Sequence, residues 1–306
     1  MTMKDINAYD EINLKELISY LRKTKVFTMV TTSFFCIGAI VFSISLPNIY
    51  TSNALLAPTQ QKSDMGNFMG SYSGLANIAG ISLPSSSSSI ESIALETLDS
   101  FKFYEENILP EIFLPDLMAY KSWDQKLDRP YYDNSLYDSQ NNKWVRNVNF
   151  PKNIIPSAQE SYTLFHDKHF SFSKNKDNGF LLVTVKHKSP FIAKKWTEII
   201  INSINSSLRE EQKARSRKSI DYLNSEISKT NYPEIKEAIS NILQSEIEKL
   251  MLIEANSDFV FRIIDPPIAS EVKSEPQRGL IILISTLLGA LISLLCILVA
   301  YFFKDK

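Results

Sequence analysis

The residues whose chemistry is easiest to recognise are three histidines. His166 and His169 are spaced as H-x-x-H, and His187 follows further along the chain. A metal centre would need acidic or thiol ligands at a matching spacing, and the sequence offers no convincing set. We therefore interpret the histidines as surface or hairpin residues, and we predict no metal and no cofactor.

Asp124 and Asp128 are the carboxylates that suggest acid–base chemistry, since paired carboxylates hydrolyse glycosidic bonds. They raise the alternative of a membrane-anchored periplasmic glycan-processing enzyme. Any sequence contains Asp pairs, however, and a pair without known geometry is weak support. The chain has no G-x-x-x-x-G-K-[ST] phosphate loop, no G-x-S-x-G elbow and no H-E-x-x-H motif. We therefore predict no catalytic residue and no enzyme.

Residues 116–150 are rich in aromatic side chains among Asp, Asn and Lys. Aromatic rings beside amides and carboxylates can stack on sugars, so this region is a candidate glycan surface. We favour a surface excursion pinned by a few half-buried rings. The rings concerned are Tyr120, Trp123, Tyr131, Tyr132, Tyr137 and Trp144.

Two long uncharged segments determine where the rest of the chain lies relative to a membrane. The chain has 306 residues, with 33 Lys and Arg against 34 Asp and Glu, which is ordinary globular composition. Residues 26–46 and 279–303, however, carry no charge, and each exceeds the ~18 residues that indicate a membrane-spanning helix. We predict two transmembrane helices there and exclude a wholly soluble protein. The first is longer than the ~7–15 apolar residues of a signal sequence, so we expect a retained anchor.

The distribution of charge predicts the orientation of these helices. Basic residues are concentrated just before the first span, and the next one after it is Lys62. The positive-inside rule therefore places the N-terminal tail, residues 1–25, in the cytoplasm. With two crossings, residues 304–306 are also cytoplasmic and residues 47–278 lie outside. The basic residues nearest to the span are Lys15, Arg22, Lys23 and Lys25.

A long helix is predicted in the central region, over about residues 190–230. Ser189-Pro190 is a typical helix start, and apolar residues then recur on one face for a length of about 60 Å. We expect a second helix, over residues 234–255, to cover part of this face and a neighbouring copy to cover the rest. The basic stretch 209–218 is interpreted as a solvated or intersubunit face, with acidic sugar or phosphate as the alternative. The predicted oligomer face comprises Trp196, Ile200, Ile204, Leu208, Ile220, Leu223 and Ile227.

Strand patterns predict an α/β base next to the membrane. Asn178-Gly179 lies between two β-prone runs and indicates a hairpin whose second arm, residues 180–187, is central in a sheet. We also expect the strands at 50–57 and 259–264 to pair with each other. A loop over 59–90 with a weak helical patch at 75–81, and an amphipathic helix over 90–107, complete the base. The predicted fold class is α+β: two terminal transmembrane helices flanking a periplasmic domain with a membrane-proximal α/β base and a long extended helical arm.

The connection into the second span is rich in proline, and residues 265–278 are expected to form an extended, fairly stiff segment. Small residues at four-residue intervals in the second span predict close helix packing. The proline segment is defined by Pro266, Pro267, Pro276 and Arg278, and the packing residues are Ser285, Gly289 and Ser293.

With these elements in place, the chain resembles a polysaccharide co-polymerase of the Wzz chain-length-determinant family over almost its whole length. The family's proline segment normally has further prolines where this chain has Ser270 and Lys273, so the segment is thinned. The resemblance rests on the two terminal spans and on the runs at 74–81, 143–146, 188–193, 219–223 and 261–266.

This resemblance implies a homo-oligomer in the bacterial inner membrane that sets the modal length of lipid-linked O-antigen polymers in lipopolysaccharide biosynthesis. The polymers would be made by a Wzy-type polymerase, and no nucleic acid would be involved. Related capsule co-polymerases carry a tyrosine kinase domain, which we do not expect here because only three residues follow the second span. For the same reason we disfavour the other alternative, a two-span sensor.

Overall fold

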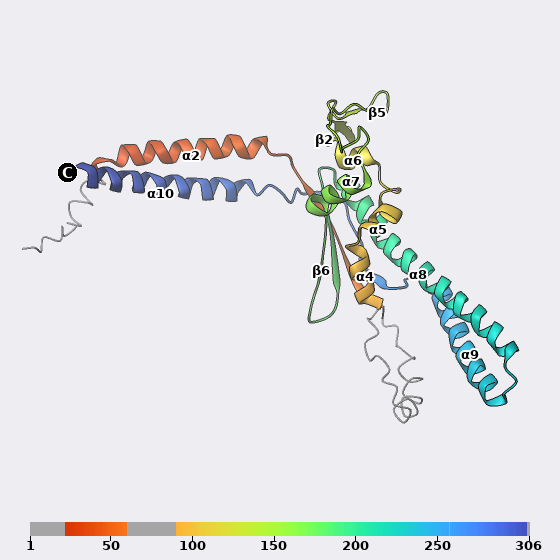
Figure 1. Ribbon diagram of the computed structural model, residues 1–306. Coiled ribbons are helices and arrows are strands. Elements are labelled where there is room, and N and C mark those ends of the chain that lie inside the picture. Colours follow the sequence, from red (N-terminus) through yellow and green to blue (C-terminus); the bar gives the residue numbers. More distant parts are fainter. Residues whose placement is uncertain (1–21, 60–89, 257, 305–306) are drawn as a thin grey trace, which may run out of the picture. The chain divides into compact units, whose positions relative to one another are not determined.

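The computed structural model describes residues 22–59, 90–256 and 258–304, which form two compact units (Figure 1). One unit combines Met1–Ile49 with Lys273–Lys306, and the other is Tyr50–Val272. The predicted fold class is confirmed, since two terminal apolar helices flank a mixed helix–sheet unit with long helices. The predicted loop over 59–90, its helical patch and the 74–81 run lie almost wholly outside the described residues.

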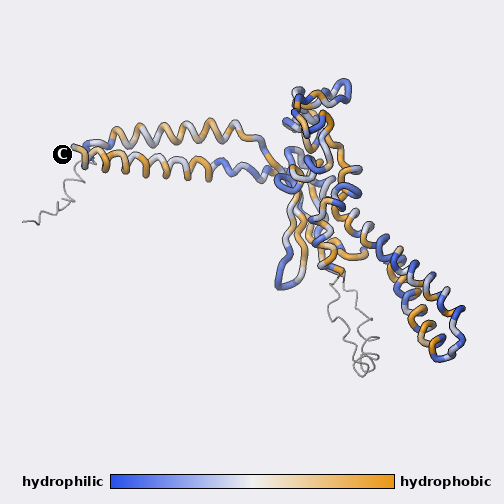
Figure 2. The backbone as a smooth tube through the Cα atoms, in the orientation of Figure 1, coloured by the Kyte–Doolittle hydropathy of each residue, from blue (hydrophilic) through white to orange (hydrophobic). Residues whose placement is uncertain are grey.

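The first unit is an antiparallel pair of helices, α2 (Lys25–Ser45) and α10 (Arg278–Lys304) (Figure 1). Both are long and apolar enough to cross a membrane, with mean hydropathies of 2.0 and 2.8 over their most apolar stretches (Figure 2). The connections beside them are joined, because the N–H of Ile49 donates to the carbonyl of Glu275 at 3.0 Å. Cys36 and Cys296 are free thiols.

A four-stranded antiparallel sheet is the base of the second unit. The strand order is β6-β7-β1-β8, so the second arm of the predicted hairpin is central and the two end strands pair, as expected. Gly179 in the hairpin turn has a φ of 72°, a left-handed conformation that favours glycine. The strands are β1 (Tyr50–Pro58), β6 (Phe170–Lys174), β7 (Leu181–His187) and β8 (Phe261–Asp265).

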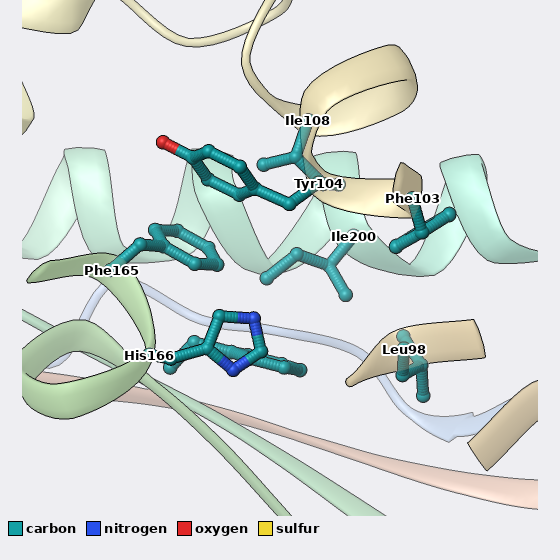
Figure 3. Close-up of a pocket in the computed structure, with 8 residues that line it drawn as sticks. Leu98, Phe103, Tyr104, Ile108, Phe165, His166 and Ile200 are labelled. Carbon is teal, nitrogen blue, oxygen red and sulfur yellow. The ribbon is translucent and has the colours of Figure 1, made fainter. Parts of the chain in front are cut away.

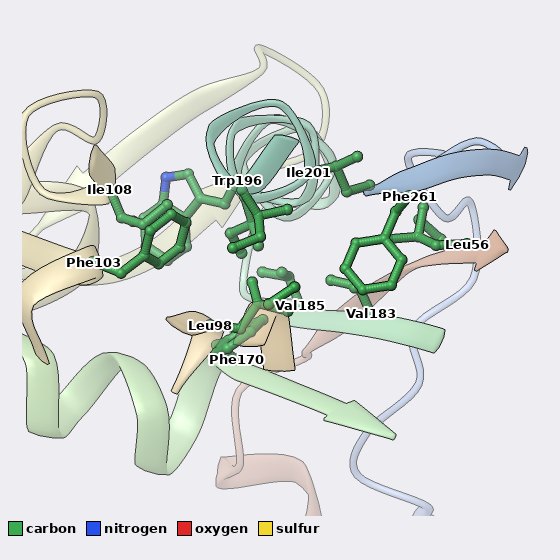
Figure 4. Close-up of a cluster of buried hydrophobic side chains, with 14 of the residues drawn as sticks. Leu56, Leu98, Phe103, Ile108, Phe170, Val183, Val185, Trp196, Ile201 and Phe261 are labelled. Carbon is green, nitrogen blue, oxygen red and sulfur yellow. The ribbon is translucent and has the colours of Figure 1, made fainter. Parts of the chain in front are cut away.

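One face of this sheet is covered by α8 (Pro190–Lys229), a continuous 40-residue helix of the predicted length. Trp196 and Ile201 of α8 pack among side chains of the strands, including Val185 and Phe261 (Figure 4). Short helices complete the core around them: α4 (Ile90–Leu98), α5 (Phe101–Phe103), η1 (Tyr104–Ile108), α7 (Ala158–Leu164) and η2 (Phe165–His169).

The prediction of one helix over residues 90–107 is wrong, because the helix breaks at Ser100. The backbone of Ser100 is extended, and its hydroxyl accepts a hydrogen bond from the N–H of Phe103 at 3.1 Å. Ser100 is therefore the N-cap of a new helix. The apolar spacing misled because residues on both sides of the break, such as Leu98 and Phe103, face the same core.

Beyond the sheet, α8 continues as one half of a helical hairpin. Its partner is α9 (Pro233–Ala255), which begins one residue before the predicted helix over 234–255 (Figure 1). Glu254 of α9 forms ion pairs with Lys213 at 3.0 Å and Arg217 at 3.2 Å on α8. We call this hairpin, residues 209–255, the arm.

An excursion from the sheet occupies residues 113–157. It contains two small antiparallel hairpins, and we use the term excursion for this segment throughout. Its elements are α6 (Leu114–Met118), β2 (Tyr120–Asp124), β3 (Arg129–Tyr132), β4 (Tyr137–Asp138) and β5 (Lys143–Trp144).

Candidate functional site

The predicted oligomer face divides into two parts with different surroundings. Four of its residues are only 1–2% exposed, because the sheet and short helices of the same chain cover them. This inner part is an intramolecular core and offers no surface to a neighbouring copy. The four residues are Trp196, Ile200, Ile204 and Leu208.

The outer part of the face lies in the arm, where Ile220, Leu223 and Ile227 are half-buried. The α8–α9 hairpin accounts for this partial burial within one chain. Apolar side chains nevertheless remain exposed on α9, among them Ile235 at 48% and Ile242 at 44%. The arm, and not the inner part of α8, therefore has apolar surface that a second copy could cover.

The charged stretch at the start of the arm is partly paired within the α8–α9 hairpin. An open hollow of 270 Å³ lies there, lined by Arg209, Glu210 and Lys213 of α8 and by Ile253 and Glu254 of α9. Lys213 is paired with Glu254, and Arg209 lies 3.9 Å from Glu210. The hollow is thus of mixed charge, and a solvated or intersubunit face fits it better than an anion site.

The predicted small-residue stripe of α10 lies against α2 of the same chain. A Cβ atom built on Gly289 would lie 2.7 Å from the Cβ of Phe35, so no larger residue fits without movement. The hydroxyl of Ser285 donates to the carbonyl of Phe35 at 3.2 Å, and Ser293 is 1% exposed. The stripe therefore allows close approach of the two helices within one chain.

The proline segment follows an irregular, non-helical path from β8 to α10. Pro267 is buried and Pro266 is exposed, both at its β8 end. At the other end, just beyond Pro276, the Arg278 guanidinium donates to the side chain of Asn48 at 3.1 Å. Arg278 thus ties the start of α10 to the chain that leaves α2.

The carboxylates considered for acid–base chemistry hold a turn instead. Asp124 accepts hydrogen bonds from the N–H groups of Lys126 and Leu127, at 2.8 and 3.2 Å. Asp128 accepts from the indole N–H of Trp123 at 2.8 Å. Both carboxylates therefore serve to close the β2–β3 hairpin.

A ladder of aromatic rings joins the excursion to the sheet. The Tyr120 ring lies 4.5 Å from that of His187, and successive centroids along the ladder are 5.2–5.8 Å apart. The first three pairs have the steep angles typical of edge-to-face packing, 71–86°, and the Tyr137–Trp144 pair is tilted at 59°. Their packing agrees with an excursion pinned by half-buried rings. The ladder runs from Tyr120 through Tyr132 and Tyr137 to Trp144.

His187, predicted as a surface or hairpin residue, lies in the hairpin at the last position of β7 and is 2% exposed. Its Nδ1 accepts a hydrogen bond from the N–H of Ser189 at 3.0 Å, so its Nε2 carries the proton and donates to the carbonyl of Asp116 at 3.1 Å. The ring is thereby held as one neutral tautomer. Burial lowers the pKa of His187 to about 3.

Neighbouring titratable groups are also affected by burial. Burial lowers the pKa of His169, whose Nδ1 lies 2.7 Å from the carbonyl of Lys186. Burial raises the pKa of Asp116, against the hydrogen bond that Asp116 accepts from the Tyr132 hydroxyl at 2.7 Å. Burial also raises the pKa of Tyr120 to about 12. Together these groups form a structural cluster at the junction of sheet, excursion and α8.

His166 lines a hollow in the core together with apolar side chains such as Leu98, Tyr104 and Phe165 (Figure 3). The hollow is too small for a water molecule, so it is not a ligand site. Among the residues that the structure describes, no three His, Cys, Asp or Glu side chains gather in a way that could hold a metal ion.

Comparison with known proteins gives a family match for one part of the chain. Residues 10–108 match the family model "Wzz: Chain length determinant protein". The predicted resemblance is therefore confirmed for the segment that includes α2, β1 and α4. Among solved structures, a full-length bacterial polysaccharide co-polymerase aligns with a TM-score of 0.41 and 13% identity, over 96% of this chain and 99% of that chain. No curated protein sequence matches the chain.

Proposed function

We propose that this protein regulates the chain length of a bacterial surface polysaccharide. The observation that carries the proposal is the match of residues 10–108 to chain length determinant proteins, in a chain with an apolar helix near each end. In this proposal α2 and α10 cross the inner membrane, both termini are cytoplasmic, and Tyr50–Val272 lies in the periplasm. The charge distribution around α2 supports this orientation.

The proposed mode of action is that of a non-enzymatic scaffold. Several copies assemble around the membrane normal beside a Wzy-type polymerase, and the assembly fixes how long a lipid-linked O-antigen chain stays engaged. The exposed apolar side chains of the arm support lateral contact between copies. Asp124 and Asp128, the carboxylates considered as a glycosidase pair, form hydrogen bonds within the β2–β3 turn.

A reconstitution tests this mode of action. Vesicles are prepared with lipid-linked repeat units and a Wzy-type polymerase, with or without the full chain. We expect polymer in both samples, with a preferred length only when the chain is present. Vesicles with the chain but no polymerase should make no polymer. Polymer in that last sample would identify an enzyme and contradict the proposal.

A further inference from the structure

Three bulky apolar side chains of the excursion are displayed on one short loop, residues 147–156, which we call the exposed loop. Phe150 is 96% exposed, and Ile154 and Ile155 are 58% and 63% exposed. Single exposed apolar residues are common on protein surfaces, but three bulky ones within six residues form a concentrated patch. Such a patch is typical of a surface that contacts a partner or a membrane.

The base of the exposed loop is held by a buried arginine. Arg146 is 7% exposed and forms a bidentate ion pair with Glu160, at 2.6 and 2.8 Å. Its Nε also donates to the carbonyls of Asn153 and Ile154, at 3.1 and 2.8 Å. The loop backbone is therefore fixed from the inside, and its apolar side chains are displayed on a prepared support.

The excursion, which carries the loop, packs against the end of the unit where the chain enters β1. The ring of Tyr50, the first residue of β1, lies 5.5 Å from that of Trp123 in the excursion, and the ring of His187, which pairs with Tyr50, lies 4.5 Å from that of Tyr120. Only residues 46–49 separate α2 from β1. Fully extended, that connection spans at most about 17 Å, while each headgroup layer of a bilayer is ~5–8 Å thick.

The charge of the exposed loop suits a lipid surface. Lys152 is its one charged residue, and it is exposed. The acidic neighbour Glu160 is neutralised by Arg146, which keeps the pKa of that carboxyl below its usual range. Lysines beside inserted Phe and Ile side chains are typical of segments that bind the interface of a membrane containing anionic lipids.

We propose that the exposed loop inserts Phe150, Ile154 and Ile155 into the headgroup region of the membrane that α2 and α10 span. The inference rests on the proposed function only through those two spans. A bilayer fits this patch better than a protein partner, because a stable protein interface buries about 800 Å² on each side and three side chains fall short of that. A weak lipid contact is sufficient here, since the spans already hold the unit close to the bilayer.

Spin-label accessibility in the full chain tests the proposal. Cys36 and Cys296 are replaced by Ala, and one cysteine at position 150 or 155 carries a nitroxide. The protein is reconstituted in vesicles of phosphatidylethanolamine and phosphatidylglycerol. We expect the label at either position to collide with oxygen several-fold more often than with a water-soluble nickel chelate. Asp177, in the β6–β7 turn, is the matched exposed control and should show the reverse.

Each other outcome overturns the proposal. If the label at Phe150 behaves as at Asp177, the exposed loop is in water. Low accessibility to both reagents would instead mean that protein covers it, either a second copy or a partner. A label at Val41 in α2 separates this result from a failure of the proposed function, because a water profile there would remove the membrane span itself.

Discussion

The side chain of Asn205 in α8 takes the place of a neighbouring strand for Phe261 in β8. Its Nδ2 donates to the carbonyl of Phe261 at 2.9 Å, and its Oδ1 accepts from the N–H groups of Phe261 and Val260, at 2.9 and 3.0 Å. Because β8 is an edge strand, its outer backbone groups have no strand partner. The side-chain amide of Asn205 therefore provides hydrogen-bond partners for the backbone at Val260 and Phe261 and holds α8 against β8.

Replacing Asn205 by Ala should destabilise the unit strongly. Two N–H groups and one carbonyl would lose their partner in a site that is 8% exposed, at a cost of about 3 kcal/mol. Denaturant unfolding of the full chain, followed by tryptophan fluorescence, measures the change. Asn202→Ala, at an exposed position on the same helix, is the matched control and should have little effect. Equal losses in the two variants would contradict the role given to Asn205.

Arg146→Ala should release the exposed loop. The change leaves Glu160 without its partner and two loop carbonyls without their donor, which we expect to cost about 3 kcal/mol. Hydrogen exchange at residues 147–156 should become markedly faster. Arg129→Ala removes an exposed arginine from the same excursion and serves as the control. Unchanged exchange in Arg146→Ala would show that the ion pair does not hold the loop.

Gly289→Leu should separate α2 from α10. Even a Cβ atom at this position approaches Phe35 to 2.7 Å, so a leucine forces the helices apart. Gly38→Leu is the control, because a Cβ there meets nothing within 4 Å. The melting temperature of the detergent-solubilised chain should fall for Gly289→Leu and stay nearly constant for Gly38→Leu. A similar fall in both would mean that the close contact with Phe35 is not the cause, because Leu favours a helix more than Gly does at either position.

Acid should destabilise the unit through His187. Its pKa is about 3 in the folded state and ~6.5 when unfolded, so the unfolded state binds the proton first as the pH falls. Stability is therefore complete above pH ~6.5 and is lost towards pH 3, by about 1.4 kcal/mol per pH unit. The groups around His187 are His169, Lys188, Asp116, Tyr120 and Trp196.

His187→Gln tests this pH dependence. Glutamine retains an N–H donor but does not titrate, so the variant should be weaker at pH 8 and lose most of the acid slope. His166→Gln, which removes a less deeply buried histidine, should keep most of it. Urea midpoints between pH 8 and pH 4 give both slopes. A full acid slope in His187→Gln would exclude this residue as the cause.

The sequence predicted the elements that depend on local periodicity. In β7, alternate residues from Leu181 to His187 are buried, as the β-prone run indicated. Asn178-Gly179 and Ser189-Pro190 marked the turn and the start of α8 because few residues suit those conformations. The apolar face of α8 was equally visible, but its pattern did not distinguish a core within the chain from an interface between copies.

Specific side-chain contacts between distant residues were beyond prediction. Asn205 stands between Ile204 and Leu208 on an apolar face, and its partners lie 55 and 56 positions away. Glu160 follows Arg146 by 14 residues with no periodic signal to link them. The burial of His187 likewise depends on Tyr120 and Trp196 from other elements. A polar residue inside an otherwise apolar stripe was the one signal that pointed to Asn205.

The size distribution of the surface polysaccharide in a strain lacking this protein tests the central claim most directly. The account predicts that the strain still makes polymer but loses its preferred length, and that the full chain supplied in trans restores that length. Loss of all polymer would contradict the account and indicate an enzyme or an exporter, and an unchanged distribution would exclude a role in length control.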